Sequence, residues 1–404
     1  MNVDEVVRDS LRELAEEQSP AGPGLAGRVL ALRRRRRTRR LVAVAAATAA
    51  VVAVTVAVPM LDSGGTTDVR PADVTAPNRI SPHPDQSPPR DMIAAGRTAL
   101  AAYYGTTLVQ RSADEAVAVR TYWLLNPATK KYVKTTKWSW VAVAPGLRTA
   151  AVLEQSLPVR RIGLLDLASG EVERWIAVDH PVGGLAFSHD GRELLTTTYS
   201  RNPDLRVKWP GDDGWMPYAE KSYRTGFHIL DVVSGKGSWT EVGPDVDRLA
   251  SVRVNSRQDF AFSRDGSRVW ADMPMPPGYL CVDRKGSGAN QSAGEKYVSW
   301  YVPAGLSPDG KRLAGDFAGG KYKSSSWILD PLTGKKVTET RGRQLLAWAD
   351  DSSLVAWDDS PDGDESRQRL VLVTPDSEKV VPLSGYRSTK VDTPGRWEPI
   401  FADR

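Results

Sequence analysis

The stretch Leu306-Ser307-Pro308-Asp309-Gly310 consists of an apolar residue followed by Ser-x-Asp-Gly, and the same pattern recurs at 187–191 and 262–266. In each copy an apolar residue also stands four positions after the Asp. Asp-Gly supplies the positive φ that a tight hairpin turn requires, and alternating residues on both sides predict β-strands. The sequence therefore predicts repeated hairpin turns at Asp190, Gly191, Asp265, Gly266, Asp309 and Gly310.

A second pattern, apolar-Asp-x-x-Ser/Thr-Gly, follows each copy of the first. Its clear copies lie at 165–170, 230–235 and 329–334, and three degenerate copies bring the total to six. Because Ser/Thr-Gly pairs also favour tight turns, each unit of about 40 to 50 residues contains two hairpins. Two hairpins form a four-stranded antiparallel sheet, so the chain is expected to contain a series of such sheets.

These repeats resemble those of TolB-like and WD-type β-propellers, with Ser-Pro-Asp-Gly at 307–310 and Leu-Asp-Pro-Leu-Thr-Gly at 329–334 as the best matches. The resemblance covers residues 96–404 and implies an all-β propeller. WD repeats proper begin with Gly-His and end with Trp-Asp, and these dipeptides do not punctuate each unit here, so the TolB-like form with six blades is expected, and seven blades are the alternative. The motif implies an architecture and no particular activity. The last strand, near Trp397 to Phe401, is expected to pair with the first blade.

An apolar segment at 41–61 contains no charged residue and is long enough to cross the roughly 30 Å hydrocarbon core of a bilayer as one helix. Arginines stand directly before it, which places the N-terminus inside and the bulk of the chain outside. The sequence therefore predicts a single-pass membrane protein whose partner is the lipid bilayer. The arginines that determine this topology are Arg33, Arg34, Arg35, Arg36, Arg37, Arg39 and Arg40.

Export with cleavage is the alternative, because residues 38–42 are similar to the core of a twin-arginine signal. The apolar run, however, exceeds the 7–15 residues usual in a signal peptide. Residues 1–40 form the basic cytoplasmic tail, in which an amphipathic helix is expected over 3–17. This tail is similar in layout to the cytoplasmic segments of anti-sigma-type regulators, so a cytoplasmic partner such as a sigma factor stays open. Residues 62–95 are rich in proline and predict a flexible linker.

The charge is localised. The net charge is +5, but residues 1–40 hold ten arginines and six acidic residues, which leaves the remainder almost neutral. The basic run borders the predicted membrane segment and lacks interleaved aromatic residues, so no nucleic-acid partner is expected. Cys281 is the only cysteine, which excludes an internal disulfide and a multi-cysteine metal site.

An insertion interrupts the repeats between Tyr199 and Thr225. Long loops on a rigid scaffold often carry binding functions. Its aromatic residues would suit a carbohydrate or a protein, although they could equally pack the loop against the sheets. The residues proposed for this binding loop are Trp209, Trp215 and Tyr218.

The chain contains no recognised catalytic motif: a Gly-x-Ser-x-Gly elbow, a Walker loop and a His-Glu-x-x-His pair are all missing from the sequence. The acidic stretch 358–365 has Arg369 where a calcium loop needs its bidentate glutamate, which favours a hairpin loop. The histidines are scattered, and each is interpreted as a surface or turn residue. They are His83, His180, His189 and His228.

No catalytic residue, cofactor site or metal site is therefore predicted. The expected function is non-catalytic binding of an extracytoplasmic protein or glycan by a membrane-anchored propeller. Two alternatives stay open: a transmembrane regulator that acts through its tail, and a hydrolase or lactonase built in the central funnel of the propeller.

Overall fold

A computed structural model of the chain describes residues 79–208, 214–219, 222–243, 254–255, 257–272, 279–299, 301–362, 364–390 and 395–404. By its internal contacts the chain divides into residues 1–68 and 69–404, and the described residues belong to the second unit. The predicted tail, its arginines and the apolar segment 41–61 lie outside the described residues. Within the described ranges, no helix is long and apolar enough to cross a membrane.

The second unit is all-β: every regular element in its described residues is a strand, and neighbouring strands pair antiparallel. The first sheet contains β1 (Ala94–Ala95), β2 (Thr98–Gln110), β3 (Glu115–Asn126), β4 (Lys131–Thr135), β10 (Leu205–Lys208), β11 (Trp215–Met216) and β27 (Glu398–Asp403). The next contains β5 (Trp138–Val143), β6 (Thr149–Glu154), β7 (Val159–Asp166), β8 (Val172–Phe187), β9 (Glu193–Tyr199), β13 (Arg224–Asp231) and β14 (Gly237–Glu241).

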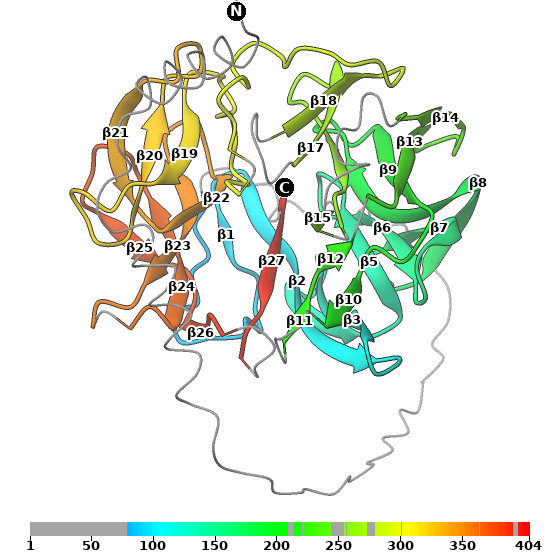
Figure 1. Cartoon of the computed structure of the whole chain (residues 1–404). Helices are drawn as coiled ribbons and strands as arrows, with labels where there is room; N and C mark the ends of the chain where they lie inside the picture. The colour runs from blue at the N-terminus through cyan, green and yellow to red at the C-terminus, as the bar shows by residue number, and fades with distance from the viewer. Residues whose placement is uncertain are drawn as a thin grey trace, which may run out of the picture. The chain divides into compact units, whose positions relative to one another are not determined.

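Smaller sheets follow along the chain, and Figure 1 shows the sheets succeeding one another around a centre. One pair joins β12 (Tyr218–Ala219) to β15 (Val254–Asn255). Two three-stranded sheets contain β16 (Phe260–Phe262), β17 (Arg268–Asp272) and β18 (Tyr279–Asp283), then β19 (Leu313–Phe317), β20 (Ser325–Leu329) and β21 (Lys336–Arg341). The last sheet contains β22 (Gln344–Trp348), β23 (Leu354–Asp359), β24 (Arg367–Val373), β25 (Val380–Pro382) and β26 (Arg387–Ser388).

The Ser-x-Asp-Gly turns have a common local structure. Gly191 lies in the turn between β8 and β9 with a φ of 72°, a conformation that glycine adopts without a steric penalty. The Ser188 hydroxyl donates a 2.6 Å hydrogen bond to Asp190 and accepts one from the backbone N–H of Glu193. The equivalent Ser-to-Asp bonds occur in the other two copies, at Asp265 and Asp309. The serine and the aspartate thus fix the turn together, which explains why both recur in the pattern.

The C-terminal strand pairs with the first long strand, which confirms the predicted closure. β27 lies beside β2, with Asp403 opposite Thr98 and Glu398 opposite Tyr104. Trp397, just before β27, is 1% exposed and packs edge-on against Trp357. The two ends of the repeat region are therefore joined by a strand ladder and by aromatic packing.

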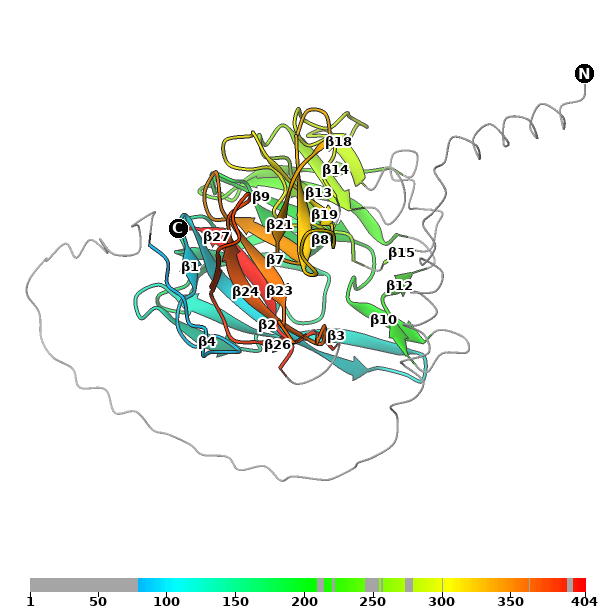
Figure 2. The same cartoon turned by 90° about the vertical axis from the view of Figure 1, so that its left-hand side faces the viewer.

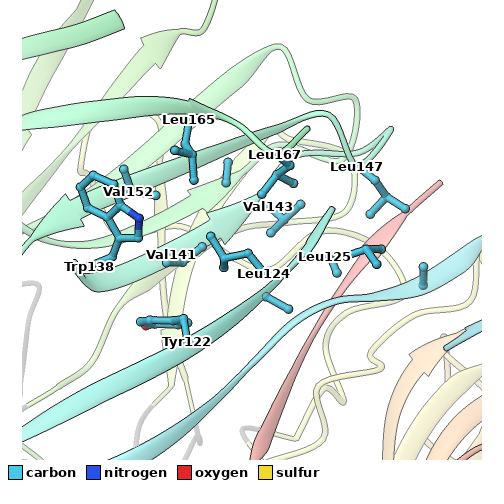
Figure 3. Packing of buried hydrophobic residues seen from close by; sticks show 14 of the residues in the cluster. Tyr122, Leu124, Leu125, Trp138, Val141, Val143, Leu147, Val152, Leu165 and Leu167 are labelled. Carbon is cyan, nitrogen blue, oxygen red and sulfur yellow. The ribbon is translucent and has the colours of Figure 1, made fainter. Parts of the chain in front are cut away.

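The hydrophobic cores lie between successive sheets and, in one case, within the sheet that contains β5–β9, β13 and β14. Figure 3 shows one of them, in which Tyr122 and Leu124 of β3 face Trp138 and Val141 of β5 together with Leu165 of β7. Further clusters join β6–β8 to β9 and β13, join β9 and β13 to β16–β18, and join β19 and β20 to β22–β24. Another joins β23 and β24 to β2. Apolar side chains of neighbouring groups of strands therefore share common cores, which cover the faces of the sheets.

The end of the predicted linker requires a correction. Residues 79–95 were assigned to the flexible linker, but they lie against the sheets. Ser81 bridges to Ala94, and His83 bridges to Ser384 of the last sheet. Met92 and Ile93 are 6% and 1% exposed. The apolar pair is buried in the core, which holds this segment in place despite its prolines.

Candidate binding face

A projecting hairpin defines one face of the unit. β27 accompanies β2 only as far as Tyr104, whereas β2 continues to Gln110 before β3 returns from Glu115. The insertion lies along this projection, because β10 pairs with β3 at its beginning and β11 pairs with β10. Figure 2 shows β2 and β3 as long strands that reach toward β10. We call this side of the unit the hairpin face.

A buried ionic network lies beneath the hairpin face. Asp204, in the insertion, accepts two hydrogen bonds from Arg120 of β3, at 2.6 and 2.8 Å. It accepts two more from Arg257, which precedes β16, both at 2.8 Å. The side chains of Arg120, Asp204 and Arg257 are only 7%, 3% and 15% exposed. Three segments distant in sequence are therefore joined by one carboxylate.

The network extends to the sheet that contains β5, β8 and β9. Arg257 also donates to Asp259 at 2.7 Å and to the Gly183 carbonyl at 2.8 Å, and the Tyr199 hydroxyl donates to Asp259 at 2.8 Å. The Trp140 ring lies 3.8 Å from the Arg257 guanidinium carbon, a cation–π contact. Every buried charge thus has partners of opposite charge or polarity, which is the condition for holding ions in a protein interior.

The electrostatics of Asp204 follow from this geometry. Burial alone would raise the pKa of the Asp204 carboxyl, but the guanidinium groups of Arg257 and Arg120 hold it well below its usual range. The carboxylate therefore stays ionised at any physiological pH. This network holds Asp204, directly before β10, against β3 and the segment before β16.

Asp272, at the end of β17, differs from Asp204 because burial dominates its environment. Burial, together with the nearby charge of Asp259, raises the pKa of the Asp272 carboxyl to about 7. Its Oδ1 is buried and has no hydrogen-bond partner among the described residues. A carboxyl held in this way is partly protonated near neutral pH.

Replacing Asp272 by asparagine should raise stability at alkaline pH. The pKa of the Asp272 carboxyl is raised from 3.8 in the unfolded chain to about 7 in the folded chain. Its contribution to the stability of the fold is therefore fully present below pH 3.8, and it is lost as the pH rises from 3.8 to about 7. Asp272→Asn removes this titration, so its advantage over the parent chain should be near zero at about pH 4 and at most about 4 kcal/mol at about pH 8. Thermal unfolding of both proteins across this range measures the effect.

The control for this comparison is Asp85→Asn, because the Asp85 side chain is 72% exposed. Its unfolding temperature should follow that of the parent chain at every pH. An Asp272→Asn variant whose advantage does not grow with pH would contradict the assignment.

Aromatic and arginine side chains pair with one another on the segments around β19, and Phe317 lies at the end of that strand. The guanidinium carbon of Arg343 lies 5.3 Å from the centre of the Phe317 ring, and its nitrogen pairs with Asp359 at 2.9 Å. Phe317 is 43% exposed and Tyr301 is 40% exposed. In a second pair, Arg341 lies over the ring of Tyr322, in the connection from β19 to β20, at 5.5 Å. We call Tyr301, Phe317, Tyr322, Arg341 and Arg343 the aromatic–arginine patch.

The three aromatic residues proposed for the binding loop do not form one described site. Trp209 lies outside the described residues. Trp215 lies in β11, half-buried, and the Lys208 ammonium is 5.4 Å from its ring. Tyr218 lies in β12, where its backbone pairs with Asn255. The aromatic–arginine patch was missed by the sequence analysis, because its members come from four separate segments.

The interpretation of the histidines as surface or turn residues is wrong for His228. That residue lies in β13, is 3% exposed, and approaches Asp179 and His180 of β8. His189 does lie exposed in the turn between β8 and β9. Sequence spacing gave no indication of the contact, since β9 separates β8 from β13 in the sheet.

The fold is that of a β-propeller. Solved structures similar to this chain include TolB from Acinetobacter baumannii, with 16% identity, a TM-score of 0.35, and coverage of 70% of this chain and 66% of that chain. The β-propeller domain of the trilobed protease from Pyrococcus furiosus has 15% identity, a TM-score of 0.36, and coverage of 69% and 83%. The Cps50 (Swd1) β-propeller domain from Myceliophteria thermophila has 11% identity, a TM-score of 0.36, and coverage of 78% and 98%.

The predicted resemblance to TolB-like and WD40-like propellers is thereby confirmed, at the level of the fold alone. No protein-family model matches the chain, and no curated protein matches it either.

Proposed function

We propose that this protein is a membrane-anchored extracytoplasmic propeller that binds a protein or glycan without catalysing a reaction. The anchor is the apolar segment 41–61, and the arginines that precede it orient the propeller outward. The binding surface that we assign is the aromatic–arginine patch, where Phe317 and Tyr301 are exposed.

We further propose that the propeller has six blades. Its blades are β27-β2-β3-β4, β5-β6-β7 with the first part of β8, the second part of β8 with β9-β13-β14, β16-β17-β18, β19-β20-β21, and β22-β23-β24-β25. The division of β8 is supported by its pairing: Val172 to Ala177 pair with β7, Gly184 to Phe187 pair with β9, and Val182 pairs with both strands. The strands outside these six groups are β1, β10, β11, β12, β15 and β26.

The observation that carries the binding proposal is the exposure of Phe317 beside Arg343. Interface hot spots are enriched in aromatic residues and arginine, and they bind best when the side chains are held in place beforehand. Arg343 is held by Asp359 at 2.9 Å, so it is ordered before any partner arrives. Phe317 offers apolar area and Arg343 offers donors, a combination that suits the face of a sugar ring or an aromatic residue of a protein.

This function is tested with the immobilised full-length chain, probed against a glycan array and against proteins of the cell envelope and culture medium. Phe317→Ala and Tyr301→Ala should each weaken a specific interaction by at least about tenfold, as expected for hot-spot residues. Val233→Ala is the matched control, because Val233 is 83% exposed in the turn between β13 and β14. Phe317→Ala and Val233→Ala variants that bind alike, or a chain that binds no probe, would contradict the proposal.

Asp272 and Asp259 favour hydrolysis as a second candidate function. General acid–base catalysis needs two carboxyl groups whose environments separate their protonation states. Asp272 has a pKa of about 7, while Asp259 accepts hydrogen bonds from Arg257 and Tyr199. Assay of the full-length chain against lactones and glycosides tests this candidate. Turnover that Asp272→Asn abolishes would support it, and a lack of turnover would dismiss it.

A further inference from the structure

Asp179, His180 and His228 converge on one point at the side of the sheet formed by β8, β9 and β13. The His228 Nε2 lies 2.9 Å from the Asp179 Oδ1, and the His180 Nδ1 lies 3.0 Å from the same oxygen. One nitrogen or oxygen atom from each of the three residues lies within 4.8 Å of the others. Two imidazoles and a carboxylate are thus close enough to share a single ion.

Neighbouring side chains hold both imidazole rings in place. The Thr196 hydroxyl lies 3.0 Å from the His228 Nδ1, on the side of the ring away from Asp179. The His180 ring stacks on Trp239, with centroids 3.7 Å apart and planes inclined by 6°. Trp239 in turn donates its indole N–H to Thr198 at 3.1 Å. Such outer partners orient ligating histidines in metal sites and raise their affinity.

Thr196 allows His228 to present a lone pair at Nε2. A threonine hydroxyl can donate or accept a hydrogen bond, so it can partner either tautomer of the ring. When Nδ1 carries the proton, it donates to Thr196 and leaves Nε2 free to ligate.

The His180 Nδ1 lies close to Asp179 but does not form a hydrogen bond with it. The His180 Nδ1 is buried and makes no hydrogen bond within the described part of the chain, although it lies 3.0 Å from the Asp179 Oδ1. Buried polar atoms nearly always have a partner. A cation between the imidazole and the carboxylate would provide one, after a small rotation of the exposed Asp179 side chain.

The site is open on one side. The side chains of His228, His180 and Asp179 are 3%, 37% and 74% exposed, so exposure rises steadily from the buried ring to the carboxylate. An ion can therefore enter beside Asp179 and keep water in its remaining coordination positions. Three protein ligands with an open fourth position are the arrangement of Zn²⁺ sites that retain a water molecule.

We propose that Asp179, His180 and His228 bind a divalent transition-metal ion of the Zn²⁺ class, with Thr196 and Trp239 as outer partners. Imidazole nitrogen favours Zn²⁺ and its neighbours in the first transition row, whereas Ca²⁺ and Mg²⁺ favour sites made entirely of oxygen. The site is separate from the aromatic–arginine patch, so it does not depend on the proposed binding function.

The experiment measures binding of Zn²⁺ and Co²⁺ to the full-length chain without a polyhistidine tag, since the chain has only 4 histidines of its own. Competition with a chromophoric chelator gives the Zn²⁺ affinity, and visible absorption of bound Co²⁺ reports the ligand geometry. We expect one ion per chain. Asp179→Asn and His180→Ala should each weaken Zn²⁺ binding by more than about a hundredfold, and Thr196→Val by about 10- to 100-fold.

His83→Ala and His189→Ala are the matched controls, and both should bind Zn²⁺ like the parent chain. Asp179 and His180 lie toward solvent, so their variants should fold, and circular dichroism verifies this. The proposal is overturned if the parent chain binds neither ion, or if Asp179→Asn and His180→Ala retain the affinity of the parent. In either case the three side chains form a hydrogen-bonded cluster only.

Discussion

The Asp204→Ala variant is expected to lose about 3–5 kcal/mol of unfolding free energy, the cost of removing one partner from a buried ion pair. The Asp204 carboxylate accepts two hydrogen bonds from Arg120 and two from Arg257. Without it, the Arg120 guanidinium, 7% exposed, loses its carboxylate partner, and the Arg257 guanidinium, 15% exposed, retains Asp259 alone of its two carboxylates. Urea denaturation of the full-length chain measures the loss.

The same variant should release the insertion from the hairpin face. Asp204 directly precedes β10, which pairs with β3 through Leu205, Arg206 and Val207. Limited proteolysis should therefore cleave the insertion faster in Asp204→Ala than in the parent chain. Asp85→Ala is the control, because the Asp85 side chain is 72% exposed and its contact with Arg90 is 4.0 Å long. Exposed pairs contribute at most about 1 kcal/mol, so equal losses in the two variants would refute the role assigned to Asp204.

The Trp397→Ala variant is expected to lose a comparable amount, about 3–5 kcal/mol, because it empties a large buried volume. Trp397 is 1% exposed and lies 5.1 Å from Trp357 and 5.4 Å from Tyr103, measured between ring centroids. It joins the last sheet to β2 at the point where the ring of sheets closes. Besides lowering the urea midpoint, the substitution should speed hydrogen exchange in the β2–β27 ladder.

Trp175→Ala is the matched control for this loss, since Trp175 is 37% exposed and its ring faces the Arg161 guanidinium. Its removal leaves a smaller cavity and should cost less than half as much. If Trp175→Ala lowers the free energy of unfolding as much as Trp397→Ala does, the packing of Trp397 where the ring closes does not contribute more to stability than an exposed tryptophan.

Local chemistry made the turns predictable. Asp-Gly at 190–191, 265–266 and 309–310 specifies positive φ within two residues, and the structure has φ values of 72°, 69° and 72° at the three glycines. The predicted insertion begins where β9 ends, at Tyr199. The closure by the last strand could also be predicted, from the resemblance to propellers, which usually close their ring in this way. These features depend on neighbours in sequence or on the repeat itself.

The candidate sites could not be predicted in this way. In the sequence, nothing distinguishes Asp204 from other aspartates in loops. Its role follows from its contacts with Arg120 and Arg257, which come from other segments of the chain. His180 and His228 show no paired spacing in the sequence, because β9 stands between their strands. The pKa of Asp272, raised to about 7 by burial and by Asp259, depends on the depth of the site and on a charge from another strand.

The sequence by itself determined the all-β class, the positions of the hairpin turns and the place of the insertion, and it predicts the membrane segment and its orientation. Only the tertiary structure decided which charges are buried together, which histidines meet and which aromatic residues stay exposed. The physical reason is that turn geometry is set by the dihedral preferences of adjacent residues. The chemistry of a site depends instead on distances and burial between residues that only the packed sheets bring together.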